Sequence, residues 1–184
     1  MFTNLNARMR QFRQDDQGYI SVEAMIVLPV LLWVFAAGWV YFDAFRQQSV
    51  SQKANYVIGD MISRETSPIS GTYVTNARKL LRELTKSSGN ESDLRLTVVQ
   101  YDGNTSSWNV VWSKKRGNQT VLNNGDLSDY ADKLPTANGG EQLIMVETWD
   151  MHEPIFDVGL SDFEIHTYSF TRPRYAPQVV FSNS

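Results

Sequence analysis

The chain has 184 residues, a formal net charge of -3 and no cysteine, and its mean hydropathy is -0.34. This length suits one folded domain with attachments. The acidic balance argues against a nucleic-acid-binding domain, whose surface would be basic, so we expect no nucleic-acid partner. The absence of cysteine excludes a disulfide scaffold, a thiolate zinc site and a cysteine nucleophile.

Residues 1–18 are expected to form a cytoplasmic leader. Arg8, Arg10 and Arg13 precede a long apolar run, and positive charges near a membrane span favour the cytoplasmic side. The N-terminus is therefore predicted in the cytoplasm and the rest of the chain on the opposite side. Positive residues also follow the apolar run, so the charge bias is modest.

The apolar run predicts a transmembrane helix. No residue from Ala24 to Phe42 is charged, and at about 1.5 Å per residue the run is long enough for a hydrocarbon core of about 30 Å. A core helix of a water-soluble protein would keep a polar face, which this run lacks. The rival interpretation is a cleaved signal peptide with Ala36-Ala37-Gly38 as its small-residue site. Apolar residues continue past that site to Phe42, so we expect the span to be retained.

The helix is predicted to continue beyond the membrane. Apolar residues recur at spacings of three and four between Val50 and Ile62, which indicates one buried stripe along an amphipathic helix. Ser67-Pro68 then disfavours further helix. We expect one helix from about Tyr19 to Glu65, with its second half packed on a globular head.

The head is predicted to begin with a helix and a hairpin. Between Thr72 and Ser88, apolar and charged residues separate onto two helical faces. From Leu94 the apolar period changes to two, and Asp102-Gly103-Asn104 supplies a turn before a second alternating run, Trp108 to Trp112. This pattern predicts a β-hairpin.

The remainder of the head is predicted as a surface excursion and two more strands. Ser113 to Gly140 is rich in turn-forming residues and includes a possible short helical turn near Leu127 to Leu134. Strands are expected at Leu143 to Met151 and Asp162 to Phe170. The tail from Arg172 to Pro177 contains two prolines, which cannot donate to a central ladder.

These elements predict an α+β fold in three parts. Residues 1–18 form the leader, 19–66 the transmembrane helix and its extramembrane extension, and 67–184 a small head. The head is expected to be an antiparallel β-sheet with one or two helices against one face.

The sequence offers no catalytic constellation. His152 and His166 are the only histidines, and each is expected alone in a strand, structural or exposed rather than a ligand. No metal loop, phosphate-binding loop or nucleophile motif is present. Trp108, Trp112 and Trp149 could line a groove, but on alternating strands they are expected to fill the core. We therefore expect no enzyme activity, no metal and no cofactor.

The boundary between leader and span carries the most informative residues. A carboxylate within a membrane span is costly, about 2.5–3.5 kcal/mol at mid-bilayer and less near the interface, so Glu23 is expected to serve a partner. The alternative is a glutamate that merely reaches the interface. Pro29 removes the helical bond to the Met25 carbonyl and is predicted to bend the span. Gly18 tolerates backbone conformations that side chains forbid, and Gly38 is predicted to serve helix packing.

These residues resemble the processing junction of type IV prepilins. Gly18 is followed by Tyr19, Glu23 stands five residues beyond the glycine, and an apolar helix comes next. The longer pattern, with Val22-Glu23-Ala24 and Leu28-Pro29, is similar to the TadE-like pseudopilins of bacterial tight-adherence (Flp) pilus systems. The resemblance covers about Gly18 to Phe45.

The resemblance implies a non-catalytic minor pilin with a pilin-like head. A prepilin peptidase would cut on the cytoplasmic face between Gly18 and Tyr19, with Glu23 as part of the recognised junction. The mature chain would sit in lipid of the bacterial inner membrane, with its head in the periplasm or, after assembly, associated with the pilus. Its partners would be other pilins and pseudopilins of the same system.

Two other classes remain open at this stage. One is a membrane-anchored periplasmic binding or sensor domain, in which the span is an uncleaved signal anchor. The other is an anchored enzyme, which lacks any supporting motif. The mature N-terminus discriminates between a pilin and a plain anchor.

Overall fold

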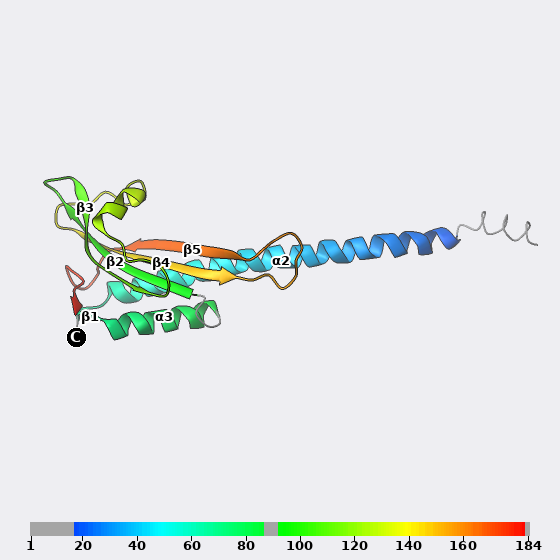
Figure 1. Ribbon diagram of the computed structural model, residues 1–184, viewed down its shortest axis with the longest axis horizontal. Helices are drawn as coiled ribbons and strands as arrows, with labels where there is room; N and C mark the ends of the chain where they lie inside the picture. The colour runs from blue at the N-terminus through cyan, green and yellow to red at the C-terminus, as the bar shows by residue number, and fades with distance from the viewer. Residues whose placement is uncertain (1–16, 87–91, 183–184) are drawn as a thin grey trace, which may run out of the picture. The chain divides into compact units, whose positions relative to one another are not determined.

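The computed structural model describes residues 17–86 and 92–182, and it is an α+β structure (Figure 1). A long helix precedes a second helix and a four-stranded antiparallel sheet. The chain forms two compact units, described separately below. One comprises Met1–Asp43 and Pro154–Leu160, and the other comprises Ala44–Glu153 and Ser161–Ser184. Of the predicted leader, residues 1–16 lie outside the described residues.

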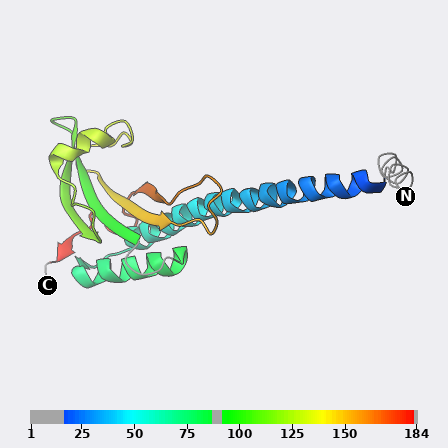
Figure 2. The same cartoon turned by 45° about the vertical axis from the view of Figure 1, so that its right-hand side comes forward.

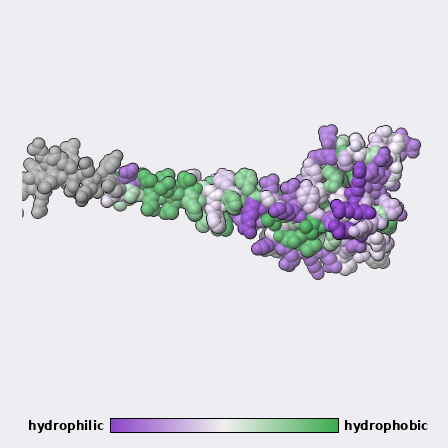
Figure 3. Space-filling view, turned by 180° about the vertical axis from the view of Figure 1, so that it is seen from behind, coloured by the Kyte–Doolittle hydropathy of each residue, from purple (hydrophilic) through white to green (hydrophobic). Residues whose placement is uncertain are grey.

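Helix α2 spans Gln17–Ser63 and continues through Pro29 without interruption. This confirms the predicted long helix within two residues at each end. Its part before Asp43 exposes almost every large apolar side chain, from Val22 (58%) to Phe42 (72%). Much of this part of the helix is coloured as hydrophobic in Figure 3. Among the described residues it is the one helix whose length and composition would allow it to cross a membrane.

The second half of α2 packs on the sheet with a stripe that is partly polar. Ala54, Ile58 and Ile62 are fully buried, as the three-four spacing predicted. Val57, which the sequence placed in the same stripe, is 47% exposed. Asn55 lies in the stripe instead and donates to the Val146 carbonyl at 3.1 Å. Because its amide bonds strand backbone directly, a polar residue takes a position that apolar periodicity alone does not reveal.

Helix α3 spans Gly71–Thr85, so it begins one residue before the predicted range. The Ser70 hydroxyl accepts a hydrogen bond from the Tyr73 N–H at its start. At its end Lys86 adopts a left-handed conformation and its N–H bonds to the Arg82 carbonyl. This cap ends the helix three residues earlier than predicted.

The sheet has strand order β3-β2-β4-β5, and every neighbouring pair is antiparallel. Its strands are β2 (Ser92–Asp102), β3 (Ser107–Arg116), β4 (Gln142–His152) and β5 (Phe163–Thr171). The predicted hairpin and both later strands are confirmed. A separate parallel pair joins β1 (Ile69–Ser70) to β6 (Phe181–Ser182). The proline-containing tail lies outside the main sheet, as expected.

A β-bulge divides the tryptophans of the hairpin between the two faces of the sheet. Val98 pairs with Trp112, whereas Val99 pairs with Val110, so Val111 is the extra residue. Trp112 therefore packs with the core beneath the helices, and Trp108 packs with the opposite face. The expectation that the two would share one face is wrong, because the bulge shifts the alternation by one residue.

Two hydrophobic clusters lie on opposite faces of the sheet. Helix α3 and the second half of α2 cover one face, and the segment after β3 covers the other (Figures 1 and 2). The helix-side cluster contains Ala54, Ile58, Ile62, Ile69, Val74, Ala77, Leu81, Leu94, Leu96, Val98, Ile144, Val146 and Val179. The opposite cluster contains Val99, Leu122, Leu127, Leu143 and Met145.

The segment predicted as a surface excursion thus helps to form the core. Strand β3 extends to Arg116, and a 3₁₀ helix, η1 (Asn124–Tyr130), follows. Leu122 and Leu127 are only 4% and 6% exposed. The many turn-forming residues of this segment indicated a surface loop, so the sequence did not predict that these two leucines are buried.

Candidate functional site

The predicted processing junction lies at the first turn of α2. Gly18 and Tyr19 are within the helix, which begins at Gln17, while Arg8, Arg10 and Arg13 lie outside the described residues. The peptide bond between Gly18 and Tyr19 is thus helical backbone. A peptidase that binds extended backbone would have to unwind the helix at this bond.

Glu23 is exposed on the apolar part of α2. It makes no hydrogen bond or ion pair with another described residue. Its neighbours Met25 and Ile26 are 76% and 64% exposed, and no other charged residue occurs between Gly18 and Phe42. Glu23 is therefore a carboxylate without a partner among the described residues, on a surface that is otherwise suited to lipid or to another apolar helix.

Pro29 and Gly38 mark two further positions on the same surface. Pro29 has no N–H, so the Met25 carbonyl lacks its helical donor and can accept a hydrogen bond from elsewhere. Gly38 is exposed, and a Cβ added there would meet nothing within 4 Å. A small residue with open space above it allows close approach of a neighbouring helix.

The head contains a buried charged cluster that the sequence did not predict. Glu147 on β4 is fully buried, and Arg95 on β2 is 6% exposed. The Arg95 Nε lies 2.6 Å from Glu147 Oε2. The Tyr130 hydroxyl donates to Oε1 at 2.7 Å, and His166 Nε2 lies 3.4 Å from the same oxygen.

Hydrogen bonding fixes the protonation of this cluster. Burial alone would raise the pKa of the Glu147 carboxyl, but the hydrogen bonds from His166 and Tyr130, together with the charge of Arg95, outweigh it and lower the pKa below its usual range. Burial and the hydrogen bond to Glu147 raise the pKa of Tyr130 to about 12. Glu147 is therefore ionised and Tyr130 neutral at pH 7.

His166 is not isolated, contrary to the expectation from sequence. Its ring stacks on Trp149, with centroids 4.7 Å apart, and the Arg95 guanidinium lies 5.0 Å from the centre of the same indole. Arg95 also donates to the Thr120 carbonyl at 3.1 Å. The cluster thereby ties the segment after β3 to the sheet. Cross-strand pairing brings its members together, and no spacing along the chain signals them.

His152 fits the expected structural role, since it is 8% exposed and packs edge-on against Phe163. Its Nε2 has no hydrogen-bond partner among the described residues. No group of three potential metal-ligating side chains occurs in the part of the chain that the structure describes.

A second polar network joins α2 to the sheet. Asp150 on β4 is 1% exposed and accepts hydrogen bonds from Ser92, Ser51 and Gln47 at 2.7, 3.2 and 3.2 Å. Gln47 also donates to the Thr85 carbonyl at the end of α3. These bonds connect both helices to one strand and fix the axial position of α2 on the sheet.

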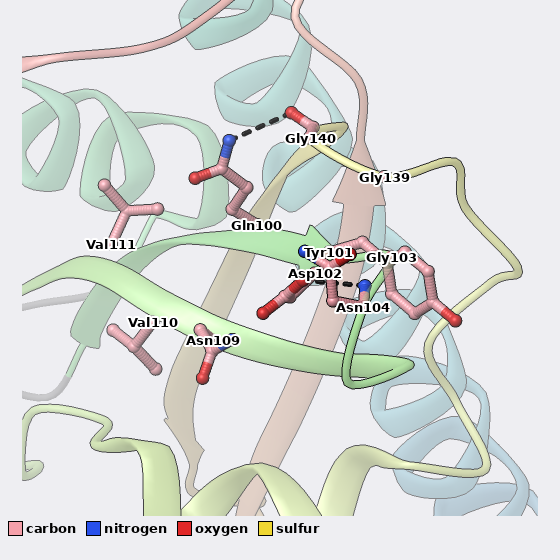
Figure 4. A pocket seen from close by; sticks show the side chains of 10 residues that line it. All are labelled: Gln100, Tyr101, Asp102, Gly103, Asn104, Asn109, Val110, Val111, Gly139 and Gly140. Carbon is pink, nitrogen blue, oxygen red and sulfur yellow. Dashed lines mark hydrogen bonds between the residues drawn. The ribbon is translucent and has the colours of Figure 1, made fainter.

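Cavities open on the head among the described residues, and neither of the two with the best-defined linings resembles a catalytic centre. The first, of about 610 Å³, lies at the end of the β2–β3 hairpin, where Gln100 donates to the Gly140 carbonyl (Figure 4). Its only carboxylate is Asp102. The second, of about 660 Å³, is lined by Trp108, Leu127 and Leu134 among others and contains no acidic or basic side chain. Such linings suit binding better than acid–base chemistry.

Comparison of the chain with family models, with curated proteins and with solved structures gives no match.

Proposed function

We propose that the chain is a TadE-like pseudopilin, a minor pilin that takes part in assembly of a tight-adherence pilus and has no catalytic role. It spans the bacterial inner membrane once, with its N-terminus in the cytoplasm and its head in the periplasm. The observation that carries this proposal is the exposed apolar surface of α2 with one carboxylate, Glu23, that has no partner in the described part of the chain.

The exposure of this surface requires an apolar environment. Leu31, Trp33 and Phe35 are 61%, 59% and 72% exposed, and each such side chain gains about 1.5–3 kcal/mol on full burial. A water-exposed helix of this composition would aggregate. Lipid and other apolar helices both satisfy the requirement, and a pilin uses each in turn as it leaves the membrane for the fibre.

Glu23 supports a partner helix rather than a plain anchor. Cleavage after Gly18 would create an α-amino group at Tyr19, about one helical turn from the Glu23 carboxylate. Opposite charges attract strongly at low dielectric, and each alone would remain unmatched. Pairing of Glu23 with the new N-terminus of a neighbouring subunit would set the axial register of packed helices. Gly38 and the free Met25 carbonyl opposite Pro29 provide contact positions for the same packing.

The proposal names three kinds of partner. Inner-membrane lipid surrounds α2 before assembly, a prepilin peptidase removes the leader, and other pilins and pseudopilins pack on the helix afterwards. No step requires a cofactor.

The second candidate is an anchored periplasmic binding or sensor domain with an uncleaved signal anchor. The 660 Å³ cavity beside Trp108 favours it, because an aromatic-lined cavity without charges suits a small apolar ligand. In that case Glu23 would simply reach the interface.

The mature N-terminus tests the proposal. Intact-mass analysis of the chain, produced together with the pilus system, should show a protein that begins at Tyr19. Gly18→Leu should leave the full-length precursor, and cells without the peptidase should give the same precursor from the wild-type chain. A wild-type chain that stays uncut in the presence of the peptidase would overturn the pilin proposal in favour of the anchored domain.

A further inference from the structure

The loop between β4 and β5 exposes apolar side chains where a soluble loop would be polar. Ile155 is 70% exposed and Phe156 is 54% exposed. Both lie within Pro154–Leu160, a segment that contains no lysine or arginine. Adjacent exposed aliphatic and aromatic residues at a loop tip indicate a contact with an apolar partner.

This loop belongs to the same compact unit as the apolar part of α2. Figures 1 and 2 both show it beside the helix. Val40 is only 2% exposed, whereas its neighbours Trp39 and Tyr41 are 58% and 44% exposed. One side of the helix is therefore covered at Val40, and the other sides remain open.

The end of the compact unit at Asp43 sets the depth that the loop reaches. The uncharged run ends at Phe42, and Asp43 is the first charge after it. Val40 precedes Asp43 by three residues, which is about 4.5 Å along the helix axis. Because the loop shares a compact unit with the helix up to Asp43 and not with the helix after it, the loop lies beside the apolar run itself.

The exposed side chains around this level suit a membrane interface. Trp39 and Phe42 point outward with 58% and 72% exposure, and Phe45 is 68% exposed. Aromatic residues concentrate where a span leaves the hydrocarbon. Phe156 adds a further aromatic residue from a distant part of the sequence.

We infer that Pro154–Leu160 is a second membrane-contacting element, with Ile155 and Phe156 inserted at the boundary between headgroups and acyl chains of the leaflet from which α2 emerges. This inference rests on the proposed membrane span. Its occupant is lipid rather than a second copy of the chain, because the loop continues the apolar surface of the span. The loop carries Asp157 and no cation, so insertion depends on apolar burial and not on anionic headgroups. The loop thereby fixes the depth at which α2 leaves the bilayer.

The absence of native cysteine allows a direct test by single-site labelling. The full chain carrying Phe156→Cys, labelled with an environment-sensitive fluorophore, is reconstituted in phosphatidylcholine vesicles with lipids spin-labelled near the headgroup. We expect the emission of the fluorophore to shift to the blue and to be quenched by the spin-labelled lipid, relative to the same fluorophore free in aqueous buffer. Asn104→Cys, on the exposed β2–β3 turn, is the matched control and should show neither change. The response of Phe156→Cys should not change when anionic lipid is added.

A third label separates failure of this inference from failure of the span. Leu31→Cys, in the middle of the apolar run, should be quenched by lipids that are spin-labelled deep in the acyl chain. If Leu31→Cys is quenched while Phe156→Cys remains accessible to a water-soluble quencher, the span stands and the loop inference is wrong. If Leu31→Cys is also accessible, the span itself is refuted. Protection of Phe156→Cys that depends on protein density in the vesicle and not on spin-labelled lipid would identify a second copy as the occupant and overturn the inference.

Discussion

Removal of one member of the buried Arg95–Glu147 pair should be severely destabilising. Glu147→Ala would leave the Arg95 guanidinium, 6% exposed, without its 2.6 Å partner. The Tyr130 hydroxyl would also lose the carboxylate oxygen to which it donates. Breaking a buried ion pair from one side typically costs about 3–5 kcal/mol of unfolding free energy.

The magnitude follows from desolvation rather than from attraction between the two charges. Both charges were taken out of water when the sheet formed, and the single substitution removes the attraction while leaving that desolvation of Arg95 in place. The double variant Arg95→Met with Glu147→Leu removes both charges and keeps apolar volume. It should therefore be much less destabilised than Glu147→Ala, although Tyr130 still loses an acceptor.

Urea unfolding of the full chain in detergent, followed by near-ultraviolet circular dichroism, measures these differences, because Trp149 stacks within the cluster. Arg64→Ala is the control, since its ion pair with Asp60 has side chains 52% and 41% exposed and should contribute at most about 1 kcal/mol. A loss below about 1 kcal/mol for Glu147→Ala, or a double variant as unstable as the single one, would refute the desolvation argument.

Three further predictions concern pH, backbone conformation and assembly. Since the folded pKa of Glu147 is lowered, its contribution to the free energy of unfolding should be complete above the ordinary glutamate pKa and be lost as pH falls below 4.5. Since the folded pKa of Tyr130 is raised, its contribution to the same free energy should be lost as pH rises from 10.0 to about 12. Unfolding midpoints measured across pH check both limbs, and a flat profile in either range contradicts the corresponding assignment. Gly117→Ala should destabilise the head by about 1–3 kcal/mol, because Gly117 has φ +113° and an added Cβ would overlap the Asp93 carboxylate. In the control variant Gly125→Ala the added Cβ meets open space, so its unfolding free energy should not change. Equal unfolding free energies for the two variants would exclude this strain. Glu23→Gln should keep membrane insertion and cleavage but sharply reduce co-purification with partner pilins, and wild-type assembly by this variant would reduce Glu23 to an interfacial residue.

The elements with strong local patterns were predictable from sequence. The uncharged run in α2, the two helical faces of α3 and the alternation on either side of Asp102-Gly103-Asn104 each depend on residues close in the chain. Hydrophobic periodicity reports such local structure because each side chain is directed by its own backbone geometry. The proposed processing junction, from Gly18 to Glu23, is likewise a local pattern.

The head core was only partly predictable, because single residues altered the period. The extra residue Val111 places Trp108 and Trp112 on opposite faces, and no turn-forming residue marks the bulge in advance. Asn55 replaces an apolar residue in the α2 stripe because strand carbonyls lie opposite it. Leu122 and Leu127 are buried in a segment whose composition indicated a surface loop.

The sequence by itself determined a long apolar helix with one carboxylate, followed by an α+β head, since those features need only neighbours along the chain. The tertiary structure alone decided which charges meet and which apolar residues stay exposed. Arg95 and Glu147 are adjacent because β2 and β4 pair in one register. Pro154–Leu160 shares a compact unit with the part of α2 up to Asp43, although more than half of the chain separates these two segments. Contacts between distant segments depend on strand register and burial of the whole core, and a one-residue slip of β2 or β4 would move Arg95 or Glu147 to the opposite face of the sheet.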